Sequence, residues 1–184
     1  LCAVVIFFCA SNKSYAQIQN ADVLNAPIDI SKDFNNYLNT FYFADELTSF
    51  DPATGKGYLI RSPNTWSTST ASPYNGQFTG VPNNGEYFNA IQLGYNLVGN
   101  PYAASIEGSH FIATNRTVEN LYFWTHTTQA VGGVYTVNNF ASYTTLGGVA
   151  SAAGGAIPDG SIKPGQGFYL YTSENENVWF HNAL

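Results

Sequence analysis

The chain has 184 residues, of which 10% are charged and 16% are aromatic, and its formal net charge is −6. Disordered chains carry much charge and few aromatic residues, so this composition indicates a folded protein, and the length fits a single domain. Six lysine and arginine residues in total are too few for the basic surface that nucleic acid or an anionic membrane requires. Both are therefore excluded as partners.

The first sixteen residues have the pattern of a secretion leader. Residues 1–10 are an uncharged apolar run, and a helix of that length, about 15 Å, is too short to cross a bilayer. Small residues stand at Ser14 and Ala16, which suits signal-peptidase cleavage after Ala16. The sequence therefore predicts a signal peptide over residues 1–16, truncated at its N-terminus, and a mature chain without a membrane span. In the alternative interpretation, the apolar run is the first buried strand of the domain.

Both cysteines, Cys2 and Cys9, lie in the predicted leader. The mature chain would then contain no cysteine, which excludes disulfides, thiolate catalysis and cysteine-based zinc sites. Lipid attachment at Cys9 is disfavoured, because Phe8 stands where lipoprotein signals place a small residue.

Residues 17–184 are predicted to form one all-β domain. Short runs rich in Tyr, Phe, Val, Ile and Thr alternate with Gly, Pro and Asn, which is the pattern of strands and turns. Helical spacing is limited to residues 33–47 and 105–113. We therefore expect an antiparallel β-sandwich, jelly-roll-like, with at most one or two short helices. The clearest predicted strands are residues 57–61, 77–81, 87–93, 95–98, 120–125, 133–137, 167–172 and 177–181.

Glycine patterns mark two further features. Residues 147–160 are rich in Gly and Ala and predict one long loop. Gly55-Lys-Gly-Tyr-Leu-Ile60 and Gly165-Gln-Gly-Phe-Tyr-Leu170 share a pattern in which the glycines permit a tight turn and an aromatic residue opens a strand. Equivalent strands in two halves of a sandwich, or chance similarity between two turns, would each explain it.

The sequence contains no motif of a catalytic or metal site. It lacks Gly-x-Ser-x-Gly and His-Glu-x-x-His, and His110, His126 and His181 are too scattered to predict a metal site. Glycosidases need two opposed carboxylates, whereas the acidic residues fall in turns or near the termini, apart from Glu86. We therefore predict neither an enzyme nor a cofactor. Residues 51–55 lack the acidic ligands of a calcium loop, but a structural calcium ion held by loop carbonyls stays an open alternative.

Aromatic side chains are the remaining candidates for a binding site. Trp124 and Trp179 lie in apolar strand runs, so we expect both in the core. Trp66 lies in a polar loop and is the tryptophan that we expect to be partly exposed. A platform for stacking on sugar rings would then consist of Trp66 with loop residues Tyr74 or Tyr102, and Asn amides would bond the sugar hydroxyls.

A series of short motifs in the second part of the chain resembles a known family. The motifs are Gly55-Lys-Gly-Tyr-Leu-Ile-Arg-Ser-Pro63, Phe78-Thr-Gly-Val-Pro-Asn-Asn-Gly85, Tyr95-Asn-Leu-Val-Gly-Asn-Pro-Tyr102, Tyr122-Phe-Trp-Thr-His126, Ile157-Pro-Asp-Gly160 and Pro164-Gly-Gln-Gly-Phe168. In this order they resemble a β-rich module of secreted Bacteroidetes (flavobacterial) surface proteins that are exported by the type IX secretion system. In those proteins the module usually precedes a C-terminal sorting domain.

The resemblance implies a protein that is secreted or held on the outer cell surface of a Gram-negative bacterium, with no catalytic residues to transfer. It also implies that the chain is truncated before a sorting domain of a larger parent protein. The sequence thus favours a non-catalytic structural or adhesive surface module, whose partners are surface glycans or neighbouring domains of the parent. A carbohydrate-binding module is the alternative, and a polysaccharide hydrolase is a third reading.

Overall fold

The computed structural model describes residues 4–7, 22–24, 43–44, 54–61, 81–125, 127–128 and 137–182. Within these ranges the chain forms antiparallel sheets, one short α-helix and one 3-10 turn, which confirms the predicted all-β class. The sandwich arrangement and its jelly-roll type stay predictions. In chain order the elements are β1 (Val4–Phe7), β2 (Asp22–Leu24), β3 (Phe43–Ala44), β4 (Tyr58–Arg61), β5 (Tyr87–Ile91), β6 (Gly94–Gly99), β7 (Ile106–Glu107), α2 (Gly108–Thr114), β8 (Val118–Trp124), η1 (Val137–Asn139), β9 (Phe140–Thr144), β10 (Gly147–Val149), β11 (Ser161–Ile162), β12 (Gly167–Thr172) and β13 (Glu176–Phe180).

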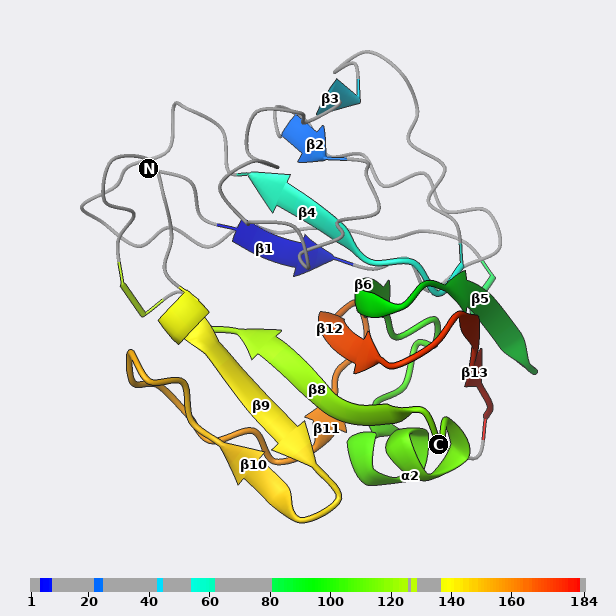
Figure 1. The fold of residues 1–184 in the computed structure, drawn as a ribbon. Coiled ribbons are helices and arrows are strands. Elements are labelled where there is room, and N and C mark those ends of the chain that lie inside the picture. Colours follow the sequence, from blue (N-terminus) through cyan, green and yellow to red (C-terminus); the bar gives the residue numbers. More distant parts are fainter. Residues whose placement is uncertain are drawn as a thin grey trace.

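The largest sheet has five strands in the order β10-β9-β8-β12-β6 (Figure 1). β12 lies between β8 and β6, and Leu170 stands opposite Leu121 of β8 and Asn96 of β6. Because side chains alternate along a strand, Phe168 and Leu170 share one face of the sheet. Both are fully buried, and this face forms the centre of the hydrophobic core.

Helix α2 packs against the core face of this sheet. Phe111 is fully buried, and its ring centroid lies 5.4 Å from that of Phe168 and 5.1 Å from that of Phe180 in β13. The helix begins where the Gly108 amide donates to the Gly160 carbonyl at 2.7 Å. A Cβ at Gly108 would lie 2.9 Å from that carbonyl oxygen, so the close approach requires glycine.

The segment directly before β4 pairs with the outer edge of β6. Lys56 forms a bridge to Val98, and the Gly57 amide donates to the Leu97 carbonyl at 3.2 Å. A Cβ at Gly57 would lie 2.6 Å from Leu97 Cγ, so a larger residue would force the two segments apart. Gly55 has a φ angle of 79°, which confirms the tight turn that the Gly55-Lys56-Gly57 pattern predicts.

The N-terminal sheet has the strand order β1-β4-β2-β3. Val4 pairs with Arg61 and Phe7 with Tyr58, so residues 4–7 of the apolar run form a strand. This arrangement corresponds to the alternative interpretation of residues 1–16. Cleavage after Ala16 would remove β1 and leave β4 paired with β2, so the leader stays a prediction.

Six predicted strands occur where the sequence places them, as β4, β5, β6, β8, β12 and β13, and the helix predicted over 105–113 is α2. The predicted strands 77–81 and 133–137 lie largely outside the described residues. So does most of the predicted helix 33–47, whose described part, Phe43–Ala44, forms strand β3 instead.

The long loop predicted over 147–160 is wrong at its start, because Gly147–Val149 pair with β9 as strand β10. Close packing explains the glycine content of this segment. A Cβ at Gly148 would lie 2.1 Å from the Pro158 carbonyl oxygen, so glycine is needed where the following segment crosses the strand.

One buried asparagine joins three backbone segments. Asn100 directly follows β6 and is fully buried. Its Nδ2 donates to the carbonyls of Ala104 at 2.7 Å, Ile162 at 3.0 Å and Lys163 at 3.2 Å, and its Oδ1 accepts from the Tyr102 amide at 2.9 Å. Each buried backbone group that loses such a partner costs about 1–3 kcal/mol. The Asn100 amide therefore fixes β7 and β11 relative to β6.

Asn100→Ala should lower the free energy of unfolding by about 3 kcal/mol, because it leaves several buried backbone groups unpaired. Urea unfolding followed by tryptophan fluorescence measures the change. Asn177→Ala, at an exposed position of β13, is the matched control and should change stability by less than about 0.5 kcal/mol. Equal losses in the two variants would contradict the role assigned to Asn100.

Alkaline pH should destabilise the fold between pH 10 and 12. Burial, with a smaller effect of the neighbouring Tyr95, raises the pKa of Tyr122 to about 12, and burial also raises the pKa of Tyr169. The native state then holds the two phenol protons more tightly than the unfolded chain does. The contribution of these protonated tyrosines to the stability of the fold is therefore complete below pH 10 and is lost as the pH rises to 12. The urea midpoint should fall across this range and fall less in Tyr122→Phe. A midpoint that stays constant from pH 10 to 12 would refute the expectation.

Candidate ligand-binding face

The three aromatic residues that the sequence predicts for ligand stacking fall in different places. Trp66 and Tyr74 lie outside the described residues. Tyr102 is buried, with 6% of its surface exposed. Its hydroxyl donates to the Gly85 carbonyl at 2.6 Å, and its ring lies 6.1 Å from that of Tyr87. The phenol therefore supports the turn before β5, and burial raises its pKa to about 12, so it stays a hydrogen-bond donor at neutral pH.

Strands β5 and β13 form a two-stranded sheet with one side open to solvent. The strands are antiparallel, and Trp179 stands opposite Phe88. Val178 and Phe180 are fully buried in the hydrophobic core. Because neighbouring residues of a strand point to opposite faces, burial of these two side chains directs Trp179 outward.

The core position predicted for Trp179 is therefore wrong. The side chain is 38% exposed and that of Phe88 is 56% exposed. The run Asn177–His181 contains apolar residues on both faces, so its composition did not separate the buried side from the open one. Trp124, also predicted to be in the core, is partly buried, and its ring lies 4.9 Å from that of Phe140.

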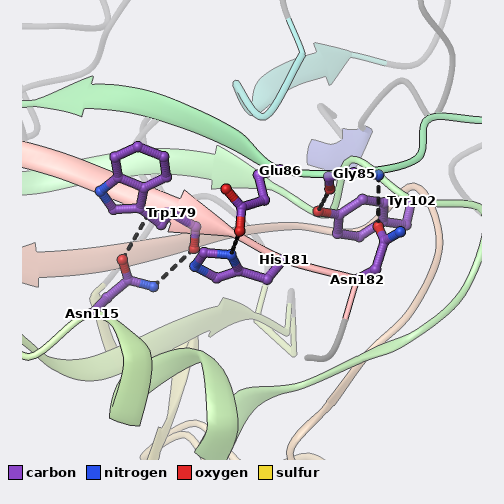
Figure 2. Close-up of polar contacts among 7 residues, drawn as sticks. All are labelled: Gly85, Glu86, Tyr102, Asn115, Trp179, His181 and Asn182. Atoms are coloured by element: carbon purple, nitrogen blue, oxygen red, sulfur yellow. Dashed lines mark hydrogen bonds and ion pairs between the residues drawn. The ribbon is translucent and has the colours of Figure 1, made fainter.

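We call Phe88, Trp179 and His181 the aromatic row. The ring centroids of Phe88 and Trp179 are 5.1 Å apart with an interplanar angle of 40°, and those of Trp179 and His181 are 6.2 Å apart and nearly parallel, at 10°. Trp179 lies in β13, and His181 follows directly after the end of this strand (Figure 2). Neighbouring aromatic side chains that stay exposed to solvent commonly mark binding sites.

Asn115, at the C-terminal end of α2, holds the backbone beneath the aromatic row (Figure 2). Its Oδ1 accepts from the Trp179 amide at 2.7 Å, and its Nδ2 donates to the Trp179 carbonyl at 3.0 Å and to the Phe111 carbonyl at 2.9 Å. Asn115 is only 4% exposed. The backbone amide and carbonyl of Trp179 are thus both bonded to the side chain of Asn115 at the end of the helix. Asn115 is also the first residue of the glycosylation sequon Asn115-Arg116-Thr117, and because it is buried its side-chain amide is not accessible.

A carboxylate lies at one end of the aromatic row. His181 Nδ1 is 3.0 Å from Glu86 Oε1 (Figure 2). An ionised carboxylate can only accept a hydrogen bond, so His181 is the donor in this contact. The Glu86 side chain is 67% exposed and that of His181 is 28% exposed, so both remain within reach of a ligand.

A groove of about 400 Å³, which we call the amide groove, adjoins the row through Asn182, which directly follows His181. Its lining residues are Asn83, Asn84, Tyr102, Ala103, Ala104, Ser105, Ile106 and Asn182. Asn182 Oδ1 accepts from the Gly85 amide at 3.0 Å, and its Nδ2 donates to Asn84 Oδ1. Figure 2 shows Tyr102 and Asn182 both reaching Gly85, which precedes Glu86. The groove and the row therefore share one short segment of backbone.

The chemistry of this face suits noncovalent binding of a polar ligand. It offers ring surfaces and the Glu86 carboxylate at the row, and neutral amides in the adjoining groove. Within the described ranges, no three His, Cys, Asp or Glu side chains gather closely enough to hold a metal ion. In the part of the chain that the structure describes, no helix is long and apolar enough to cross a membrane.

Phe88 was not among the predicted site residues, and the Asn amides predicted as partners of sugar hydroxyls were not assigned to Asn83, Asn84 or Asn182. A local signal existed, since Trp179 and His181 are two residues apart and must share a face if residues 177–181 form a strand. The pairing of β5 with β13 joins distant parts of the sequence, so the position of Phe88 beside Trp179 had no local signal.

Comparison with known proteins identifies a family without a described function. No curated protein and no solved structure matches the chain. One family profile matches residues 24–184, a range that includes both the aromatic row and the amide groove. Because this match spans most of the chain, the protein belongs to the family described as Domain of unknown function (DUF8693).

Proposed function

We propose that the protein is a non-catalytic binding module that recognises glycans through the aromatic row. The observation that carries this proposal is the exposure of Phe88 and Trp179 on the open side of a sheet whose other side buries Ile91, Val178 and Phe180. Leaving 56% of Phe88 and 38% of Trp179 exposed forgoes part of the roughly 1.5–3 kcal/mol that full burial of each such side chain would give. A bound ligand would supply the missing contact.

Sugars match the chemistry of this face better than purely apolar ligands do. A pyranose ring presents a face of C–H groups that can lie on an aromatic ring, while its hydroxyls need hydrogen-bond partners at the rim. Glu86 and the exposed Asn177 are such partners beside the row. A mostly apolar contact surface with a few placed polar groups is the usual composition of a ligand site.

The same geometry argues for binding without hydrolysis. Hydrolysis of a glycosidic bond normally uses two carboxyl groups placed on either side of the bond. The described part of the face brings one carboxylate, Glu86, to the row, and His181 already contacts it. We therefore assign Glu86 to ligand positioning and propose no catalytic step.

A second function, docking against a neighbouring domain of a larger parent protein, is favoured by a different surface. Leu146, Val149 and Ile157 are 99%, 62% and 66% exposed around strand β10. Such apolar side chains suit contact with protein. This docking and glycan binding use separate surfaces, so substitutions in each can distinguish them.

We further propose that the module is exported and acts at the cell surface. Support comes from the apolar run before Ala16 and from the motifs that resemble secreted Bacteroidetes modules. The range matched by the family profile begins at residue 24, beyond the predicted leader. A low-charge surface with a net charge of −6 is compatible with this location.

Trp179→Ala should abolish most glycan binding, because it removes the middle ring of the row. The measurement is binding of the purified protein to an array of cellulose, xylan, mannan, chitin and laminarin oligosaccharides, followed by calorimetry with the strongest probe. We expect a dissociation constant at least tenfold higher than that of the native protein, and a comparable loss in Phe88→Ala. Leu146→Ala, which truncates an exposed apolar residue outside the row, should bind normally. Absence of binding to every probe, or normal binding by Trp179→Ala, would rule out the proposal.

Export should produce a mature protein that begins at Gln17. The chain is expressed in a Gram-negative host behind an added Met and a short basic segment, and the exported protein is analysed by mass spectrometry. Ala16→Leu is the control and should slow processing, because signal peptidase requires a small residue before the cut. An exported protein that retains residues 1–16 would show that the apolar run belongs to the domain.

A further inference from the structure

We infer that the amide groove is a second subsite of the same ligand face, and that it takes an uncharged sugar unit that donates a hydroxyl or amide hydrogen to Asn83. This inference rests on the proposed glycan binding and adds to it the class of sugar and its position. The groove holds about 400 Å³, within the range of small-molecule sites.

Asn83 supplies the specific chemical signal. It lines the groove and is 6% exposed. Its Nδ2 donates to the Pro101 carbonyl at 2.8 Å, which fixes the orientation of the amide. Its Oδ1 is buried and has no hydrogen-bond partner. A buried acceptor without a partner is costly, and because an amide oxygen only accepts, the partner that it lacks must be a donor.

The charge of the groove selects a neutral ligand. None of its eight lining residues carries a charge at neutral pH, and no lysine or arginine is among them. The nearest acid on the face is Glu86, and the whole chain has a net charge of −6. A uronic acid or a sulfated sugar would bring a further negative charge with no cation to pair it. Hydroxyl groups, in contrast, match the amides of Asn83, Asn84 and Asn182.

The groove is held rigidly next to the row. Gly85 is bonded on one side by the Tyr102 hydroxyl and on the other by Asn182 Oδ1. Asn182 directly follows His181, the last ring of the row, and Gly85 directly precedes Glu86. A linear oligosaccharide lying on Trp179 and His181 would therefore continue into the groove. The row supplies stacking, and the groove fixes the sugar at one end.

The test compares probes of increasing length with the native protein and a variant whose groove is filled. Ala103 is exposed and lines the groove, so Ala103→Trp should fill it without touching the row. Ala156→Trp adds the same side chain at an exposed position outside the groove and is the matched control. Urea unfolding establishes that both variants keep native stability. Calorimetry then measures each protein with di-, tri- and tetrasaccharides of the neutral sugar that binds best, and with tetragalacturonate.

In the native protein and in Ala156→Trp, lengthening the probe beyond the disaccharide should raise affinity at least tenfold, and tetragalacturonate should bind at least tenfold more weakly than the neutral tetrasaccharide. In Ala103→Trp the gain with length should disappear, while disaccharide binding stays. If Ala103→Trp keeps the gain, or if tetragalacturonate binds as tightly as the neutral probe, the groove inference is overturned while glycan binding by the row stands. If no probe binds the native protein, both ideas fail.

Discussion

Burial of Val178 and Phe180 is the constraint from which the ligand-binding face follows. Both side chains are fully buried in the core, so the residue between them must point to the other side of the strand. That residue is Trp179, and Asn115 then bonds its amide and carbonyl from the end of helix α2. The packing of the core therefore directs the Trp179 indole to the open side of the sheet, and the two hydrogen bonds to Asn115 hold its backbone.

The segment Asn96-Leu-Val-Gly-Asn-Pro-Tyr102, the most specific part of the resemblance, connects the core to this face. Val98 is buried in β6, and Asn100 donates to three carbonyls in two following segments, at Ala104 and at residues 162–163. The Pro101 carbonyl then accepts from Asn83, and the Tyr102 hydroxyl donates to Gly85. A stretch of seven residues thus fixes the central sheet, the amide groove and the turn that brings Glu86 to His181.

The sequence was sufficient for the fold class and for the longer strands. β8 and β12 are dense in aromatic and branched residues and are flanked by turn residues, and these patterns act locally. Strands of two or three residues, such as β7 and β11, carry too little pattern to be recognised. The glycines of β10 suggested a loop, because the contact of Gly148 with Pro158 that requires glycine is not visible in the sequence.

The candidate site was less predictable for a related physical reason. In β13 apolar residues occur on both faces, so no alternation of apolar and polar residues distinguishes Trp179 from its buried neighbours. In β5 the usual order is reversed, since Asn89 is 8% exposed and Phe88 is 56% exposed. A rule that places polar residues outside therefore selects the wrong face. The amide groove is assembled from three separate segments of chain, and only the folded structure brings them together.

The most direct test of the central claim is to observe the three tryptophan indole N–H signals by NMR while a neutral oligosaccharide is added. Trp179→Phe identifies the signal of Trp179. If the β5–β13 face binds the sugar, the Trp179 signal should shift in a saturable way, and the signal of the partly buried Trp124 should stay in place. A saturable shift confined to Trp66 or Trp124, with Trp179 unchanged, would contradict the account.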